Sequence, residues 1–166
     1  TADGGYIMGG FVSVPSENES TVSSLLIKLD DTGEIVWSNN FQIDNNWTVG
    51  VCAKQSNDGG YIITGSTKTS STEDPFLIKT NSLGNVESNN VYNFGYEASA
   101  TYLIQNTEGS YIFIATGGGY TFLLKTIPND GLADDYKTFS SLNGYYFQQT
   151  SDNGYIIVGD KSQNIG

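Results

Sequence analysis

One short pattern recurs along this chain and constrains its fold more than any other feature. An acidic residue, a turn containing glycine and a Tyr-Ile pair return four times in the 166 residues, at spacings of 55, 50 and 44 residues. The four copies begin at Asp3, Asp58, Glu108 and Asp152. A repeat of about 50 residues whose length varies in the loops is typical of propeller blades.

Two further motifs accompany this pattern in a constant order. An apolar run ends in a lysine, and a glutamine lies three residues before the acid. The lysines are Lys28, Lys79 and Lys125, and the glutamines are Gln55, Gln105 and Gln149. Because three motifs keep their order in successive copies, the chain is predicted to repeat one structural unit.

Each unit is predicted to form four short antiparallel strands. In the second unit these are residues 51–55, 61–66, 76–80 and 86–91. Glycine supplies the positive φ that the tight turns between strands require. The second and third strands are apolar on both faces, which indicates a sheet covered on both sides. No segment has a helical apolar period, so the predicted fold class is all-β: consecutive four-stranded blades of a β-propeller-like array.

Residues 1–166 are interpreted as a single repeat region. Its units span about 1–50, 51–100, 101–144 and a partial unit at 145–166. The first unit lacks the strand expected before Asp3, and the last unit stops after its second strand. Since propellers have about four to eight blades, we expect an incomplete segment of a larger propeller, or one that borrows a strand from another molecule.

A family resemblance follows from these residues. The pattern Gln-x-x-Asp-Gly-Gly-Tyr-Ile, followed by Leu-Ile-Lys-Leu-Asp-x-x-Gly-x-x-x-Trp, resembles the Asp-Gly-Gly-Tyr-type β-propeller repeats of large bacterial and archaeal secreted or cell-surface proteins. The fullest match runs from Asp3 to Trp37, and the second unit departs from it at Asn81 and Ser88. The resemblance covers essentially the whole chain and implies a propeller fold. These repeats are distantly similar to quinoprotein propellers, but no residues here match a quinone site, so no cofactor is expected.

The composition excludes several functions. The chain has 18 acidic and 7 basic residues, a formal net charge of -11, no histidine and no arginine. Such a surface repels phosphate backbones, and no apolar run reaches the roughly 18 residues of a membrane span. Without histidine, and with Cys52 as the sole cysteine, neither a nucleophile–histidine pair nor a Cys/His zinc site can form. We therefore predict no nucleic-acid partner, no membrane insertion, no catalytic or metal-binding residues, and a protein that is not an enzyme.

The four acids of the repeated turn admit two interpretations. They could be calcium ligands, but aspartate also stabilises a tight turn by accepting hydrogen bonds from its own backbone. The turn role is favoured because Glu108 replaces aspartate and no Asp-x-Asp-x-Asp spacing is present. Water should then leave these acids with ordinary pKa values. For the repeated lysines, an edge-protecting charge at a strand end is favoured over contact with an anionic ligand.

Some loop residues are candidates for surface contacts. Trp47, Tyr96 and Tyr120 lie in predicted loops and could stack on sugar rings. The loop of Tyr120 is predicted to be flexible and to span residues 117–120, which include three successive glycines. Asn18 and Asn46 begin N-glycosylation motifs. The main hypothesis is a non-catalytic structural or adhesive module of an extracellular or cell-surface protein, whose partners are other segments of the same larger protein, neighbouring copies or glycans. The alternative is a carbohydrate- or calcium-binding propeller attached to an enzyme elsewhere in the chain.

Overall fold

The computed structural model describes residues 1–15, 20–69 and 72–161, and all regular elements in these ranges are β-strands. The strands are β1 (Tyr6–Val14), β2 (Thr21–Leu29), β3 (Ile35–Phe41), β4 (Thr48–Gln55), β5 (Tyr61–Thr69), β6 (Thr72–Thr80), β7 (Val86–Val91), β8 (Ser99–Gln105), β9 (Tyr111–Gly117), β10 (Tyr120–Thr126), β11 (Ala133–Ser140), β12 (Leu142–Gln149) and β13 (Tyr155–Lys161). The all-β prediction is confirmed. No helix in the described ranges is long and apolar enough to cross a membrane.

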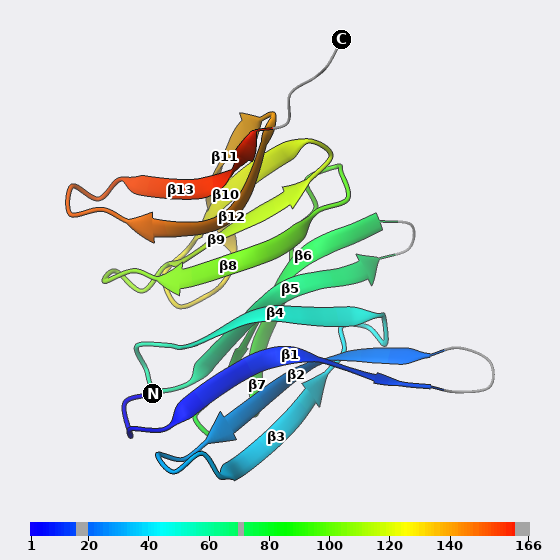
Figure 1. The fold of residues 1–166 in the computed structure, drawn as a ribbon, viewed down its shortest axis with the longest axis vertical. Helices are drawn as coiled ribbons and strands as arrows, with labels where there is room; N and C mark the ends of the chain where they lie inside the picture. Colours follow the sequence, from blue (N-terminus) through cyan, green and yellow to red (C-terminus); the bar gives the residue numbers. More distant parts are fainter. Residues whose placement is uncertain (16–19, 70–71, 162–166) are drawn as a thin grey trace.

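Consecutive strands form four antiparallel sheets (Figure 1). Sheet 1 is β1-β2-β3, sheet 2 is β4-β5-β6-β7, sheet 3 is β8-β9-β10-β11 and sheet 4 is β12-β13. The spatial order equals the chain order, so hairpins connect neighbouring strands within each sheet. Sheets 2 and 3 confirm the prediction of four-stranded antiparallel units, whereas the described part of the chain forms no closed ring.

The repeated turns lie where the sequence places them. Gly4, Gly59 and Gly109 take positive φ angles of 84°, 86° and 90°. In the fourth turn Asn153 takes this conformation with φ 64°, which asparagine tolerates better than most residues. One predicted loop is wrong: residues 117–120 form only a two-residue turn, and Tyr120 begins β10. Its two central glycines adopt the positive φ that a tight hairpin demands.

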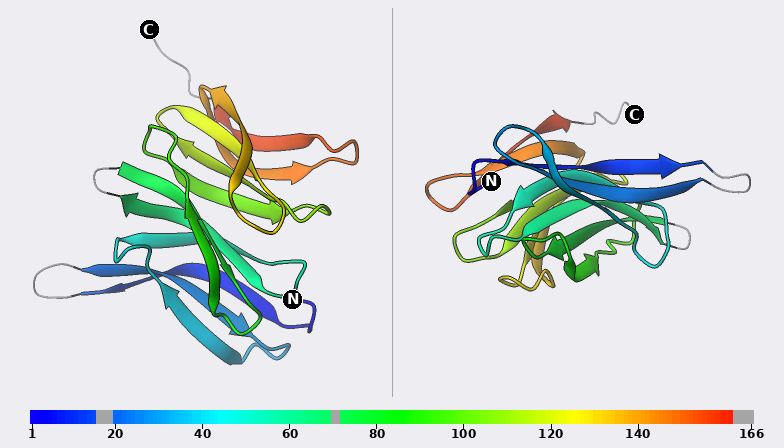
Figure 2. Two further views of the ribbon diagram at one scale, coloured as in Figure 1. Left: turned by 180° about the vertical axis from the view of Figure 1, so that it is seen from behind. Right: turned by 90° about the horizontal axis from the view of Figure 1, so that it is seen from below.

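The sheets stack face to face in chain order (Figures 1 and 2). The first strand of each later sheet lies on the sheet before it: β4 on β1 and β2, β8 on β4, β5 and β6, and β12 on β8, β9 and β10. The N-terminal sheet therefore occupies one end of the long axis and the C-terminal sheet the other. Each contact between neighbouring sheets contains one of three apolar clusters.

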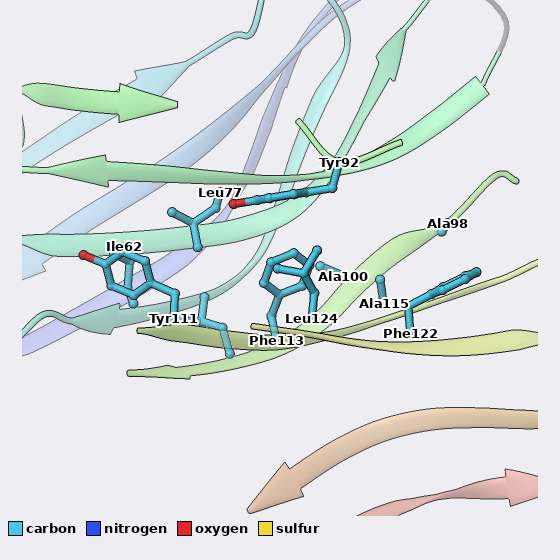
Figure 3. Close-up of a cluster of buried hydrophobic side chains, with 11 residues drawn as sticks. Ile62, Leu77, Tyr92, Ala98, Ala100, Tyr111, Phe113, Ala115, Phe122 and Leu124 are labelled. Carbon is cyan, nitrogen blue, oxygen red and sulfur yellow. The ribbon is translucent and has the colours of Figure 1, made fainter. Parts of the chain in front are cut away.

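Alternate side chains of a strand enter different clusters. On β5, Tyr61 and Ile63 pack against sheet 1, whereas Ile62 packs against sheet 3. Figure 3 shows the cluster between sheets 2 and 3, in which Ile62 lies beside Tyr111 of sheet 3. This double coverage explains why the second strand of each unit is apolar at successive positions rather than alternating.

Candidate functional site

The repeated acid and the repeated lysine, which lie far apart in each unit of the sequence, meet in the structure. The pairs are Asp3–Lys28 at 2.9 Å, Asp58–Lys79 at 2.6 Å and Glu108–Lys125 at 3.5 Å between carboxylate oxygen and Nζ. Hairpin register brings them together: Lys79 of β6 lies opposite Ile62 of β5, one residue after Tyr61. Its side chain therefore reaches back to the turn that precedes β5.

These lysines are not edge-protecting charges. Lys28 and Lys79 are only 3% and 6% exposed, so the edge-protection prediction is wrong for both residues. The physical reason is that β2 and β6 are central strands with neighbours on both sides. Lys79 also forms an ion pair with Glu87 of β7. Burial lowers the pKa of Lys79, but hydrogen bonds to Asp58 and Glu87 outweigh burial and raise it overall.

The pKa values of three turn acids, Asp3, Asp58 and Asp152, are lowered. Asp58 Oδ1 accepts hydrogen bonds from the Gly60 amide at 3.0 Å and from the Ser56 hydroxyl. Desolvation raises the pKa of Asp58, but the hydrogen bonds from Lys79, Ser56 and Gly60 prevail and lower it to about 2. The prediction of ordinary pKa values is therefore wrong for these three aspartates, because each carboxylate accepts several hydrogen bonds at once.

The first turn resembles the second in these contacts. Asp3 Oδ1 accepts a hydrogen bond from the Gly5 amide at 3.2 Å. Hydrogen bonds from Thr1, Lys28 and the Gly5 amide lower the pKa of Asp3 far below its ordinary value. In the fourth turn, Asp152 accepts from the Gly154 amide at 3.1 Å.

The third turn uses a different capping residue. Asn106 Oδ1 accepts hydrogen bonds from the amides of Glu108 and Ser110 at 3.1 and 2.8 Å. The carboxylate of Glu108 instead forms the ion pair with Lys125. The residue two positions before the acid thus takes part in all four turns, and sequence reasoning missed it. Its signal was a short polar side chain at one repeated position: Thr1, Ser56, Asn106 and Thr150.

Two of the repeated glutamines, Gln55 and Gln105, connect consecutive sheets. Gln55 Oε1 accepts from the Ala2 amide at 2.7 Å, and Gln105 Oε1 accepts from the Asn57 amide at 2.7 Å. Each glutamine also donates through Nε2 to its own turn, to Gly59 O at 3.4 Å or Gly109 O at 3.0 Å. One side chain therefore holds its own hairpin and the turn of the preceding sheet.

Asparagines form a second set of connections on the last strand of a sheet. Asn39 Nδ2 donates to Gly84 O at 3.0 Å, and Asn90 Nδ2 donates to Asp130 O at 3.5 Å. A Cβ at Gly84 would lie 2.4 Å from Asn39 Nδ2 and 3.1 Å from the Trp37 ring, so it would displace the Asn39 amide, and the φ of 80° also favours glycine. The hydroxyl of Tyr92, which directly follows sheet 2, donates a further hydrogen bond to the carbonyl oxygen of Gly131.

A polar cleft of about 640 Å³ lies where the β3–β4 connection meets the ends of β2, β5 and β6. Its lining residues are Ser20, Thr21, Val22, Gln42, Asn45, Asn46, Trp47, Lys68 and Glu73. Trp47 is half-buried there. The other two candidate aromatics do not line this cleft: Tyr96 and Tyr120 pack on each other with ring centroids 5.2 Å apart.

The two glycosylation motifs differ in what the structure describes. Asn18 lies outside the described residues. Asn46 is half-buried in a turn, and the hydroxyl of the fully buried Thr48 donates to its carbonyl oxygen at 3.0 Å. Because the motif's threonine is enclosed in the fold, attachment of a glycan at Asn46 would have to precede folding. Glycosylation at both sites stays a prediction.

Neither a metal-binding cluster nor a reactive thiol is found in residues 1–15, 20–69 and 72–161. Within them, no group of three Cys, Asp or Glu side chains could hold a metal ion. Cys52 is half-buried and free, and desolvation raises the pKa of its thiol. No protein-family model matches the chain, and no curated protein matches it significantly.

Proposed function

We propose that this chain is a non-catalytic structural or adhesive module of an extracellular or cell-surface protein, and that its sheets are blades of a β-propeller-like array. One observation carries the proposal: the repeated polar side chains hold turns and connect sheets. The acids pair with lysines of their own sheet, and the glutamines and asparagines bond to backbone of a neighbouring sheet.

The electrostatics of the ion pair support a structural role. General acid–base catalysis near neutral pH works best with a group whose pKa lies near the working pH. The pKa of Asp58 is lowered to about 2, and that of Lys79 is raised above its ordinary value. Both side chains therefore stay charged at neutral pH. This suits a structural ion pair, whereas a proton-transferring group has to gain and lose its proton near the working pH.

The surface location rests on the repeat resemblance and on a net charge of -11, which favours solubility and disfavours anionic surfaces. Brief protease treatment of intact source cells, followed by mass spectrometry, tests it. We expect peptides of this chain to be released while a cytoplasmic marker stays intact. Recovery of these peptides only after cell lysis would contradict the surface location.

Turnover of a substrate by the purified chain, lost in Asp58→Asn, would contradict the non-catalytic role.

A second candidate function is carbohydrate binding at the polar cleft. The observation that favours it is a half-buried Trp47 beside the amides of Gln42, Asn45 and Asn46. An aromatic face with nearby amides suits the apolar face and hydroxyls of a sugar ring. Calcium binding has weaker support, since the turn acids are already paired with lysines or with their own turns.

A glycan array followed by calorimetry tests this second function. A sugar that binds the wild type should bind Trp47→Ala at least about tenfold more weakly, the loss of one aromatic contact of about 1.4 kcal/mol. Tyr96→Ala serves as the control, because Tyr96 does not line the cleft. Equal weakening in both variants, or no binding to any glycan, would exclude the cleft as a sugar site.

A further inference from the structure

Five aromatic rings form a continuous row at the edge of the apolar cluster between sheets 2 and 3. The row runs through Tyr96, Tyr120, Phe122, Phe94 and Tyr136, and the ring centroids of successive members lie 5.2, 6.2, 4.3 and 5.4 Å apart. Its residues come from the β7–β8 connection and from the strands β10 and β11. Phe122 lies at the opposite end of the cluster from Ile62 (Figure 3). The row therefore continues the buried cluster outward to the protein surface.

The tyrosines of this row, Tyr96, Tyr120 and Tyr136, form what we call the tyrosine surface. Tyr96 and Tyr136 are 49% and 53% exposed, although they belong to the contact between two complete four-stranded sheets. Glycines precede two of the tyrosines: a Cβ added at Gly95 or at Gly119 would meet nothing within 4 Å. Open space therefore borders these rings. Exposed aromatic patches of this kind mark interaction sites.

The hydroxyl groups of the tyrosine surface are free to donate hydrogen bonds. Within residues 1–15, 20–69 and 72–161, the hydroxyls of Tyr96, Tyr120 and Tyr136 have no hydrogen-bond partner. By contrast, the exposed Tyr145 donates to the carboxylate of Asp160. A ligand that fits the tyrosine surface thus needs apolar faces for the rings and acceptors for the hydroxyls. A polyproline II helix offers both, because it has proline rings and its backbone carbonyls make no internal hydrogen bonds.

The charge beside the tyrosine surface favours a basic ligand. Glu97, which directly follows Tyr96, is exposed and forms no ion pair with any lysine of the described ranges. The chain as a whole carries a net charge of -11, so its field attracts cations. Sugar recognition instead needs several placed polar groups around the aromatic ring, and the amides near Trp47 supply these in the polar cleft.

We propose that the tyrosine surface is a docking site for a proline-rich segment of another protein, bound as a polyproline II helix with a basic residue next to Glu97. Proline rings stack on the tyrosine rings, and the tyrosine hydroxyls donate to carbonyls of the segment. Because this helix repeats every three residues, prolines at that spacing lie on one side and face the row together. The inference rests on the proposed interaction role and names the class of partner that sheets 2 and 3 accept.

Fluorescence anisotropy with the 166-residue chain and a labelled peptide of about eight prolines followed by two arginines tests the proposal. We expect saturable binding that Tyr96→Ala and Tyr136→Ala each weaken at least about fivefold, because tyrosines dominate such contacts. Tyr6→Ala is the matched control: Tyr6 is 56% exposed and lies on sheet 1, so affinity should stay within about twofold. Glu97→Gln should weaken binding of this peptide but not of one whose arginines are replaced by serines.

Two further comparisons separate this mode of docking from its alternatives. A glycine–serine peptide with the same two arginines keeps the charge but not the helix, and should bind at least about tenfold more weakly. Tyr136→Phe keeps the ring and removes the hydroxyl, so the loss of one hydrogen bond should weaken binding about two- to fivefold. Thermal unfolding of the tyrosine variants should match that of the wild type, because Tyr96 and Tyr136 are half exposed.

Several results would overturn the proposal. These are no saturable binding of the proline peptide, equal affinity for the glycine–serine peptide, or unchanged affinity in both alanine variants. Tighter binding of chitohexaose at the same tyrosines would assign the surface to glycans instead. Such a failure leaves the surface location and the lack of activity untouched, and those are tested separately by protease treatment and substrate screening.

Discussion

Removing both carboxylates around Lys79 should destabilise the fold far more than removing the lysine charge. Lys79 is 6% exposed, and its ammonium has two anionic partners, Asp58 and Glu87. In Asp58→Asn/Glu87→Gln the cation stays enclosed without compensation, which typically costs about 3–5 kcal/mol. Both carboxylates are about half exposed, so partial access of water to the site places the expected loss near the lower figure, about 3 kcal/mol.

Urea unfolding followed by circular dichroism measures this loss, and a fall in Tm of about 6–12 °C should accompany it. Adding Lys79→Met to the double variant removes the charge but keeps the apolar stem, so most of the lost stability should return. Glu108→Gln is the control, since its pair with Lys125 is exposed and worth under about 1 kcal/mol. A double variant within about 1 kcal/mol of wild type, or no rescue by Lys79→Met, would refute the reasoning.

Two other predictions concern pH and turn geometry. The pKa of Asp58 falls from 3.8 to about 2 on folding, so the stability that its charged form contributes is present above pH 3.8 and is lost as the pH falls toward 2. The free energy of unfolding, measured by urea between pH 5 and about pH 2, should show this loss. Its dependence on pH should be flatter for Asp58→Asn. Gly84→Ala should cost at least about 1 kcal/mol more than Gly33→Ala, because both residues have positive φ but only the added Cβ at Gly84 meets Asn39; equal losses in urea unfolding would contradict this.

Local signals allowed much of the fold to be predicted. The turns at residues 3–5 and 58–60 and the strand that begins at Tyr61 follow from glycine's conformational freedom and from apolar patterning within a few residues. The loop at residues 117–120 was predicted wrongly, because three glycines are compatible with a flexible loop and with a tight hairpin. The flanking strands decide between the two, and they pair up to Gly117 and from Tyr120.

The errors at the candidate site have a different origin. The sequence revealed that Asp58 and Lys79 recur in register, but not that they touch, because that depends on the pairing of β5 with β6. Burial of Lys79 depends on the position of β6 in the centre of its sheet. The perturbed pKa values follow from both facts. The contact of Gln105 with the preceding turn requires knowledge of how sheets stack, which no single unit contains.

The account's central claim is that the repeated polar residues hold consecutive sheets together, and Gln105→Ala tests it most directly. This change removes one hydrogen bond to the preceding turn and two within its own sheet, from Nε2 to Gly109 O and to Asn129 Oδ1. Urea unfolding should show a loss of about 1–2 kcal/mol, whereas the exposed Gln148→Ala should change stability by no more than about 0.5 kcal/mol. Equal, negligible losses in the two variants would contradict the claim that this glutamine connects sheets 2 and 3.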